Sequence, residues 1–352
     1  MTGNARKFGI IGCQHAHIGM FIEEMLALGY ECAGVYEPDN KPLARTLADR
    51  YGLELTWDRE SLLSDEGVSV IGCAAINHEK MDVIELCELH GKPIMIDKPA
   101  VTNRAGLTRL RGVLERGRIE VGMMLTERFR PSLHTVQRMI RAGDLGDIVH
   151  ISMRKPHRLN PEARPAWHFD KSQSGGIIND LFVHDFDLLR WLTGREVETT
   201  SGYLAKNILP EYPTFYDTAG VQVFMAGGIT AQLYADWHTP AGSWTWGDGR
   251  IFITGTHGIA EIRLEGDPLL SSNEVALVIT DQELRSLLLA PPPLSLAQDF
   301  LNRVEGEEGI ITHDDIYKAS EATVTADEEA RILIGNRECM RLSPQTERIE
   351  EA

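Results

Sequence analysis

The chain has 352 residues, 43% of them hydrophobic and 25% charged, so its composition is that of a globular protein and its length predicts two domains. Its net charge of −17, from 35 basic and 52 acidic residues, argues against a nucleic-acid or anionic-membrane partner, because both favour a basic surface. No apolar run approaches the roughly 20 residues of a membrane helix, and the polar start lacks the apolar centre of a signal peptide. The five scattered cysteines form no C-x-x-C pair, which favours a reducing, cytoplasmic location.

The first third of the chain alternates apolar strands with amphipathic helices. Strands are predicted at 7–12, 31–36, 68–74, 92–97 and 119–125, and helices at 18–28, 41–51, 79–90 and 102–116. This alternation predicts βαβ units in a doubly wound parallel sheet, which is a Rossmann domain at 1–123. Because ligands of such sheets bind at the carboxyl ends of the strands, the residues that follow each strand are informative.

The turn after the first strand has the outline of a dinucleotide fingerprint, G-x-G-x-x-G, with two glycines replaced. Gly12 holds the first glycine position, whereas Gln14 and His17 hold the second and third. The free N–H groups of the following helix still favour an anion, so the candidate cofactor residues of this turn are Gly12, Cys13, Gln14 and His17. Glu37 lies near the expected place of a carboxylate that binds a ribose diol and repels a 2′-phosphate. This predicts NAD rather than NADP; a doubly wound domain that binds no nucleotide is the alternative.

The second half predicts a further α/β domain at 124–340. Helices are expected at 132–142, from the glycine turn at 175 to about 192, at 295–305 and at 314–334. Strands are expected at 147–153, 218–225, 229–235, 250–254, 258–264 and 274–280, in an antiparallel or mixed sheet. Residues 341–352 are polar and are predicted to form a loose tail.

The helix after the glycine turn carries a candidate proton-transfer pair. Asp180 and His184 are four residues apart and therefore lie on one helix face, with Asp187 one further turn along. An imidazole beside a carboxylate can move one proton on or off a substrate hydroxyl near neutral pH. The alternative is a helix with solvated acidic residues and a satisfied core histidine.

The order of these motifs resembles that of the Gfo/Idh/MocA-type oxidoreductases over residues 8–335. The resemblance is carried by the glycine turn, the acidic end of the second strand, Asn77, Asp97-Lys98-Pro99, Arg128-Phe-Arg-Pro131, residues 143–146 and the helix of Asp180 and His184. The family implies an N-terminal Rossmann domain and a C-terminal α/β domain with an open, mainly antiparallel sheet that builds a homodimer or homotetramer. It also implies hydride transfer between NAD(P) and a hydroxyl-bearing carbon of a sugar, cyclitol or sugar derivative.

The resemblance implies roles for single residues. Lys98 would bind the reacting hydroxyl beside the nicotinamide, Asp180 would orient the substrate and the proton-transfer group, and His184 would be the general base or acid. Asn77 and Lys98 would also contact the cofactor. The chain departs from the family at the two replaced glycines, at Asp97 in place of glutamate, at Ile76 in place of a common proline and at Lys80 in place of a frequent histidine.

Further polar and aromatic residues are candidates for binding the substrate: Arg128, His157, Trp167, His168 and His238. Aromatic rings beside imidazoles suit a sugar, which presents apolar faces and a hydroxyl rim. His168, Asp180, His184 and His238 could also form a metal site, but their spacing lacks a compact ligand motif and we expect no metal. The alternatives to a sugar or polyol dehydrogenase are a metal- or cofactor-assisted lyase, epimerase or hydrolase, and a non-catalytic ligand-binding protein.

Overall fold

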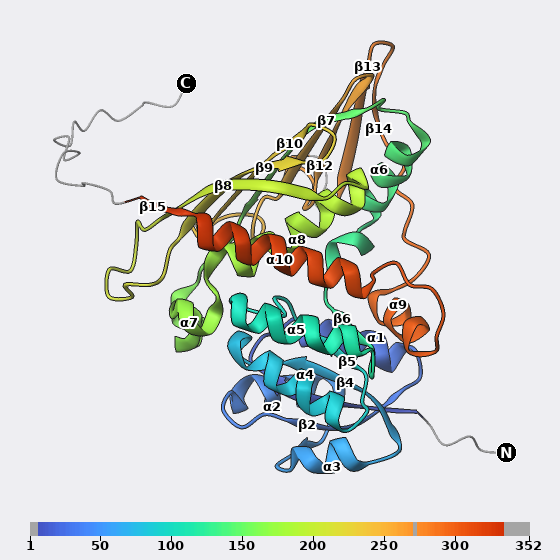
Figure 1. The fold of residues 1–352 in the computed structure, drawn as a ribbon, viewed down its shortest axis with the longest axis vertical. Coiled ribbons are helices and arrows are strands. Elements are labelled where there is room, and N and C mark those ends of the chain that lie inside the picture. Colours follow the sequence, from blue (N-terminus) through green and yellow to red (C-terminus); the bar gives the residue numbers. More distant parts are fainter. Residues whose placement is uncertain (1–5, 270–272, 334–352) are drawn as a thin grey trace.

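Two β-sheets organise the residues that the computed structural model describes, 6–269 and 273–333 (Figure 1). The first sheet has six parallel strands in the order β3-β2-β1-β4-β5-β6, which is the strand order of a Rossmann domain. Its strands are β1 (Lys7–Cys13), β2 (Glu31–Tyr36), β3 (Leu55–Thr56), β4 (Val68–Ala74), β5 (Ile94–Ile96) and β6 (Val121–Met123). The predicted parallel sheet is therefore confirmed.

Helices connect these strands: α1 (Ile18–Ala27), α2 (Lys41–Tyr51), α3 (Arg59–Ser64), α4 (Lys80–Leu89) and α5 (Arg104–Arg116). The apolar face of α1 and the almost fully buried strand β1 pack in one hydrophobic core. A short apolar run was therefore sufficient to predict β1, and a 3.6-residue apolar pattern was sufficient to predict α1. Strand β3 and helix α3 were not predicted, because two and six residues are too short to show a period.

The second sheet has nine strands in the order β14-β13-β12-β11-β7-β10-β9-β8-β15. Its strands are β7 (Ile148–Pro156), β8 (Val197–Ala205), β9 (Thr218–Met225), β10 (Ile229–Asp236), β11 (Arg250–Gly255), β12 (Gly258–Arg263), β13 (Val275–Thr280), β14 (Leu284–Ser286) and β15 (Arg331–Leu333). Among the described strand pairs of this second sheet, only β7–β10 and β8–β15 are parallel. This confirms a mixed, mainly antiparallel sheet. Strand β8 was missed because it has few apolar residues and only one of its residues is fully buried.

The helices of the second domain are α6 (Pro131–Ala142), α7 (Lys171–Ser174), α8 (Gly176–Thr193), α9 (Leu296–Val304) and α10 (His313–Glu329), with short 3-10 turns at Thr126–Phe129, Pro161–Ala163 and Ala166–Phe169. A further 3-10 turn, Asn77–Glu79, precedes α4 in the first domain. Helix α10 is shorter than predicted, because Ala330 has an extended backbone and the next residues join the sheet as β15. The predicted polar tail, 341–352, lies outside the described residues.

Helix α10 lies between the nine-stranded sheet and the helices of the first sheet (Figure 1). It packs against α8, α5 and β8, while α9 packs against α1. Apolar side chains of both closing helices, such as Phe300 and Ile316, are buried in the core of the first sheet. Helices α9 and α10 thus return to the N-terminal domain and fix the two sheets relative to each other.

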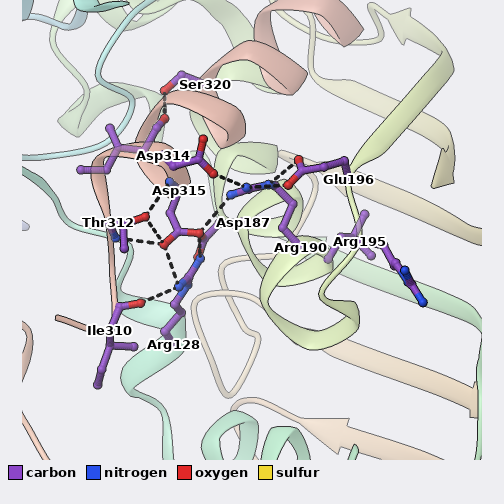
Figure 2. A network of polar contacts seen from close by, with 12 residues as sticks. Arg128, Asp187, Arg190, Arg195, Glu196, Ile310, Thr312, Asp314, Asp315 and Ser320 are labelled. Atoms are coloured by element: carbon purple, nitrogen blue, oxygen red, sulfur yellow. Dashed lines mark hydrogen bonds and ion pairs between the residues drawn. The ribbon is translucent and has the colours of Figure 1, made fainter. Parts of the chain in front are cut away.

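A buried network of ion pairs joins α8 to α10 (Figure 2). Arg128 donates to both carboxylate oxygens of Asp187 at 2.9 and 2.6 Å, and it also pairs with Asp315 at 2.9 Å. Arg190, one turn further along α8 than Asp187, pairs with Asp314 and Asp315 at 2.8 and 3.0 Å. Removing one partner of a buried pair typically costs about 3–5 kcal/mol, so this network holds α8 in place.

Helix α8 begins at a glycine turn and is buried along most of its length. Gly175 and Gly176 have φ of 84° and 78°, in the left-handed region that favours glycine. A Cβ atom on Gly175 would lie 3.0 Å from Asn179 and 3.1 Å from Thr102. The turn therefore needs glycine, and it sets the direction in which Asp180 and His184 project. Among the described helices, none is long and apolar enough to span a membrane.

Candidate active site

The turn between β1 and α1 packs tightly against the end of β4. Gly12 has φ of 89°, and a Cβ atom there would lie only 2.6 Å from the backbone nitrogen of Ala75. Any side chain at this position would therefore displace the strand. Gly12 plays the part of the first fingerprint glycine, which allows the tight turn.

The carboxylate of Glu37, at the end of β2, is buried and fully engaged by this turn. Its Oε1 accepts hydrogen bonds from Gln14 Nε2 at 2.7 Å and from the amides of Asp39 and Asn40 at 2.8 and 2.9 Å, and its Oε2 accepts one from the amide of Cys13. The other end of the Gln14 amide, Oε1, accepts a 3.1 Å hydrogen bond from Trp167 Nε1. Gln14 thus bridges Glu37 of the first half to Trp167 of the second.

A buried lysine fixes the turn that carries Lys98. Lys80 is fully buried, and its ammonium donates to Asn77 Oδ1 at 2.9 Å and to the carbonyls of Asp97 and Lys98 at 2.7 and 3.1 Å. The amide of Asn77 in turn donates to the carbonyl of Ser174 at 2.8 Å. Lys80, a departure from the family pattern, therefore satisfies carbonyls that would otherwise be buried without donors.

Lys98 and Asp180 form an ion pair between the two halves of the chain. The ammonium of Lys98 lies 2.8 Å from Asp180 Oδ1 and also donates to the Asp180 carbonyl at 2.8 Å. Burial opposes ionisation of Asp180, but the charge and the hydrogen bond of Lys98 hold its pKa well below the ordinary value. Asp180 is therefore a carboxylate that keeps Lys98 in one position.

Two cavities meet at this ion pair. The larger, about 560 Å³, runs from the β1–α1 turn and the start of α2 to Lys98 and Asp180. The smaller, about 260 Å³, is lined by residues of the second half together with Lys98, and His184 opens onto it. The residues shared by both cavities are His17, Lys98, His157, Leu181 and Trp246. Lys98 thus lies where an occupant of one cavity meets an occupant of the other.

His184 is a neutral imidazole with a free nitrogen. Its Nδ1 is buried and has no hydrogen-bond partner among the described residues. Burial, followed by the charge of Lys98, lowers the pKa of His184 well below 6.5, so the ring is unprotonated at neutral pH. The carboxylate of Asp180 bonds to Lys98, and no hydrogen bond joins it to His184 among the described residues. The two residues share a helix face but serve different cavities.

Sequence reasoning did not single out three charged residues of the smaller cavity, which are Glu127, Arg130 and Lys155. Lys155 is buried and lies 2.7 Å from Asp185 Oδ1. Burial raises the pKa of Glu127, but Lys155 and Arg130 outweigh it and lower that pKa to about 2. The available signal was the Lys155-Pro156-His157 run, which lies at the carboxyl end of β7 once that strand extends to Pro156.

The predicted substrate residues are divided between several places. His157 lines both cavities, and Trp167 contacts Gln14. His168 is buried among aromatic rings, with its centroid 5.2 Å from that of Trp237, and burial lowers its pKa to about 4. His238 bonds to Asp217 at 2.9 Å and lines neither cavity. The guanidinium of Arg128 is engaged in ion pairs with Asp187. Arg128 lines neither of the two cavities.

These features define the class of protein: a Rossmann domain and a mixed-sheet domain with a lysine-centred site between them. Residues 6–118 match the family model "Oxidoreductase family, NAD-binding Rossmann fold", and residues 133–261 match the "GFO/IDH/MocA C-terminal domain". The chain belongs to the Gfo/Idh/MocA family of oxidoreductases.

Similar proteins include an inositol 2-dehydrogenase of Saccharopolyspora erythraea, 27% identical over 64% of this chain and 65% of that one. The scyllo-inositol 2-dehydrogenase (NAD(+)) of Bacillus subtilis is 29% identical over 62% of each chain. The matches thus span just under two thirds of these relatives. A crystal structure of a protein from Erwinia carotovora atroseptica is 26% identical, with a TM-score of 0.85 over 94% of this chain and all of that one. Levoglucosan dehydrogenase in complex with NADH and levoglucosan, 18% identical, shares the fold with a TM-score of 0.78 over 93% and 97%.

Proposed function

We propose that this protein is an NAD-dependent dehydrogenase that oxidises a secondary alcohol of a sugar, a cyclitol or a sugar derivative. The observation that carries the proposal is the position of Lys98, held 2.8 Å from Asp180 where the two cavities meet. The inositol dehydrogenases among its relatives support the substrate class. We infer that residues 1–123 bind the cofactor and that residues 124–340 bind the substrate and build subunit contacts.

The larger cavity fits a dinucleotide. It begins at the β1–α1 turn, where Gly12 permits the close approach of strand and helix, and it ends at Lys98. The residues that would hold the cofactor are Gly12, Cys13, His17, Glu37 and Lys98, and a carboxylate at Glu37 favours NAD over NADP. Gln14 is an obstacle, because its side chain has to leave Glu37, which the amides of Cys13, Asp39 and Asn40 also engage, before that carboxylate can bind a ribose diol. When bound, NAD supplies the hydride acceptor.

The smaller cavity fits a polyol. Its wall combines charged groups (Glu127, Arg130 and Lys155) with His157 and the ring of Trp246. Charged and imidazole groups bind hydroxyls, and an indole covers the apolar face of a sugar ring. The contacts of Asn77, Arg128 and His238 with other protein groups leave them outside this proposal.

Two residues would carry the proton chemistry. An alcohol loses hydride only as its O–H proton leaves, so a base is needed beside the hydroxyl. His184, which lines the smaller cavity, supplies a neutral imidazole whose buried Nδ1 has no partner among the described residues. The ammonium of Lys98 would stabilise the negative charge that develops on the oxygen, while Asp180 keeps that ammonium in place.

The remaining expectations concern assembly and location. Large apolar side chains are exposed on the nine-stranded sheet: Val149, Phe224, Phe252, Ile259 and Ile279. We infer that a second copy covers this face in a homodimer or homotetramer. Cys13, Cys32, Cys73 and Cys87 are free thiols, which supports a reducing, cytoplasmic location.

The test is an initial-rate assay of the purified protein with NAD⁺ and a panel of inositols and sugars, following the absorbance of reduced nicotinamide. We expect turnover of at least one polyol, and loss of that turnover in His184→Ala. A protein that turns over no member of the panel and binds no NAD⁺ would contradict the proposal. The same turnover in His184→Ala as in the wild type would contradict the role of His184.

A further inference from the structure

The β1–α1 turn carries two imidazoles that face one buried carboxylate. His15 and His17 follow β1, and Asp97 follows β5 at the same carboxyl edge of the parallel sheet. The Nδ1 atom of His15 lies 3.3 Å from Asp97 Oδ2, and the Nδ1 atom of His17 lies 3.2 Å from Asp97 Oδ1. The side chain of Asp97 is only 2% exposed, whereas those of His15 and His17 are 28% and 42% exposed and line the larger cavity.

We propose that His15, His17 and Asp97 bind a divalent first-row transition-metal ion whose remaining coordination positions face the larger cavity. Two imidazoles and one carboxylate form a common ligand set for such ions. Among the described residues, no other group of three or more histidine, cysteine or carboxylate side chains is close enough to share an ion. The proposal goes beyond the dehydrogenase function and rests on other contacts, although it shares His17 with the proposed cofactor site.

The separations of the ligand atoms suit a shared ion. With metal–ligand distances of about 2.1 Å, neighbouring ligand atoms are roughly 3.0 Å apart in octahedral and roughly 3.4 Å apart in tetrahedral geometry. The separations of 3.3 Å from His15 Nδ1 to Oδ2 and 3.2 Å from His17 Nδ1 to Oδ1 lie between these values, and one ligand atom from each of the three residues lies within 4.8 Å of the others. The three side chains would draw closer together to share one ion.

The neighbouring lysines do not occupy the site. The ammonium of Lys80 contacts the side chain of Asn77 and the carbonyls of the Asp97-Lys98-Pro99 turn, and Lys98 pairs with Asp180. The Asp97 carboxyl group and the two partly exposed imidazoles are thus available to an incoming ion.

The test is calorimetric titration of the metal-stripped protein with Zn²⁺ and with Mn²⁺, without nucleotide or substrate, together with the visible absorption of a Co²⁺ complex. We expect one equivalent of at least one ion to bind, and His17→Ala and Asp97→Asn each to weaken that binding by about tenfold or more. The control is His90→Ala, which removes an imidazole that lies 3.5 Å from a single carboxylate, that of Glu60. This variant should bind the ion with wild-type affinity.

Two results would overturn the proposal. Wild-type protein that binds none of the three ions would mean that only protons are shared within the cluster. Equal binding by the wild type, His17→Ala and Asp97→Asn would place the ion elsewhere. Circular dichroism of each variant establishes that it is folded, and His17→Gln, which keeps a polar side chain, replaces His17→Ala if that variant unfolds. None of these results depends on whether NAD binds.

Discussion

The two ends of the larger cavity differ in how closely they follow the family pattern. At the inner end, Lys98 and Asp180 keep the residue types of the family and form an ion pair, with His184 one helical turn further along α8. At the outer end, Gln14 and His17 replace glycines, and the side chain of Gln14 closes onto Glu37. The residues for hydroxyl chemistry are thus kept while the cofactor turn is rebuilt. Nucleotide affinity and hydroxyl chemistry are therefore two separate properties to measure in this protein.

The largest expected effect comes from the inner end. His184→Ala should lower kcat by about 10²–10⁴, because a positioned general base contributes that much to proton transfer. Steady-state kinetics with the best polyol and saturating NAD⁺ measure the effect. His90→Ala, on the surface of the Rossmann domain, is the control and should retain wild-type kcat. A kcat within a few fold of wild type in His184→Ala would remove the histidine from the mechanism.

The next effect comes from the outer end. Gln14→Gly should tighten NAD⁺ binding by about tenfold. In this variant NAD⁺ no longer has to break the hydrogen bond between Gln14 and Glu37 before it binds. Trp167→Phe removes only the indole donor to Gln14 and should produce a smaller change in the same direction. Calorimetric titration measures both. Weaker NAD⁺ binding in Gln14→Gly would mean that Gln14 contacts the cofactor directly.

A smaller effect concerns the choice between cofactors. Glu37→Gln should weaken NAD⁺ more than NADP⁺, because it removes the charge that would repel a 2′-phosphate. The ratio of the two dissociation constants is the quantity to compare with wild type, since it cancels any general damage to the turn. If the ratio does not change, Glu37 is a structural residue of the turn and does not contact the ribose.

The smallest effect is on stability and concerns His168, which is buried among aromatic rings. Burial lowers the pKa of His168 to about 4, so between about pH 4 and 6.5 the unfolded chain binds a proton that the folded chain excludes. The free energy of unfolding should therefore fall as the pH drops through this window. Chemical unfolding at several pH values measures the slope, and His168→Phe should reduce it. An equal slope in His168→Phe would assign the pH dependence to other groups.

Much of this architecture could be predicted from the sequence, because its strands and helices have long, regular apolar patterns. The parallel sheet and the glycine turn before α8 follow from strand ends and helix periodicity, whereas a shared site for Lys98 and Asp180 was implied only by the family resemblance. The contacts do not support the prediction that Asp180 orients His184. A shared helix face places two side chains near each other, but it does not determine that Asp180 forms its hydrogen bond with Lys98 instead of His184.

Other features could not be predicted because they depend on side chains that meet across distant elements. Lys80 is a departure from the family in sequence, and only the fold shows its ammonium among the carbonyls of the Lys98 turn. The hydrogen bonds of Gln14 to Glu37 and Trp167 join residues far apart in the chain. Arg128 is a candidate substrate residue by motif, but its partners on α8 and α10 make it structural.

The most direct test of the central claim is calorimetric titration of the wild-type protein with NAD⁺ and NADP⁺, after removal of any nucleotide that co-purifies. We expect both to bind at the rebuilt turn, because Gln14 can move away from Glu37. NAD⁺ should bind more tightly than NADP⁺, because the carboxylate of Glu37 repels a 2′-phosphate. Folded protein that binds neither nucleotide would contradict the dehydrogenase function and would mean that the Gln14–Glu37 contact has closed the cofactor site.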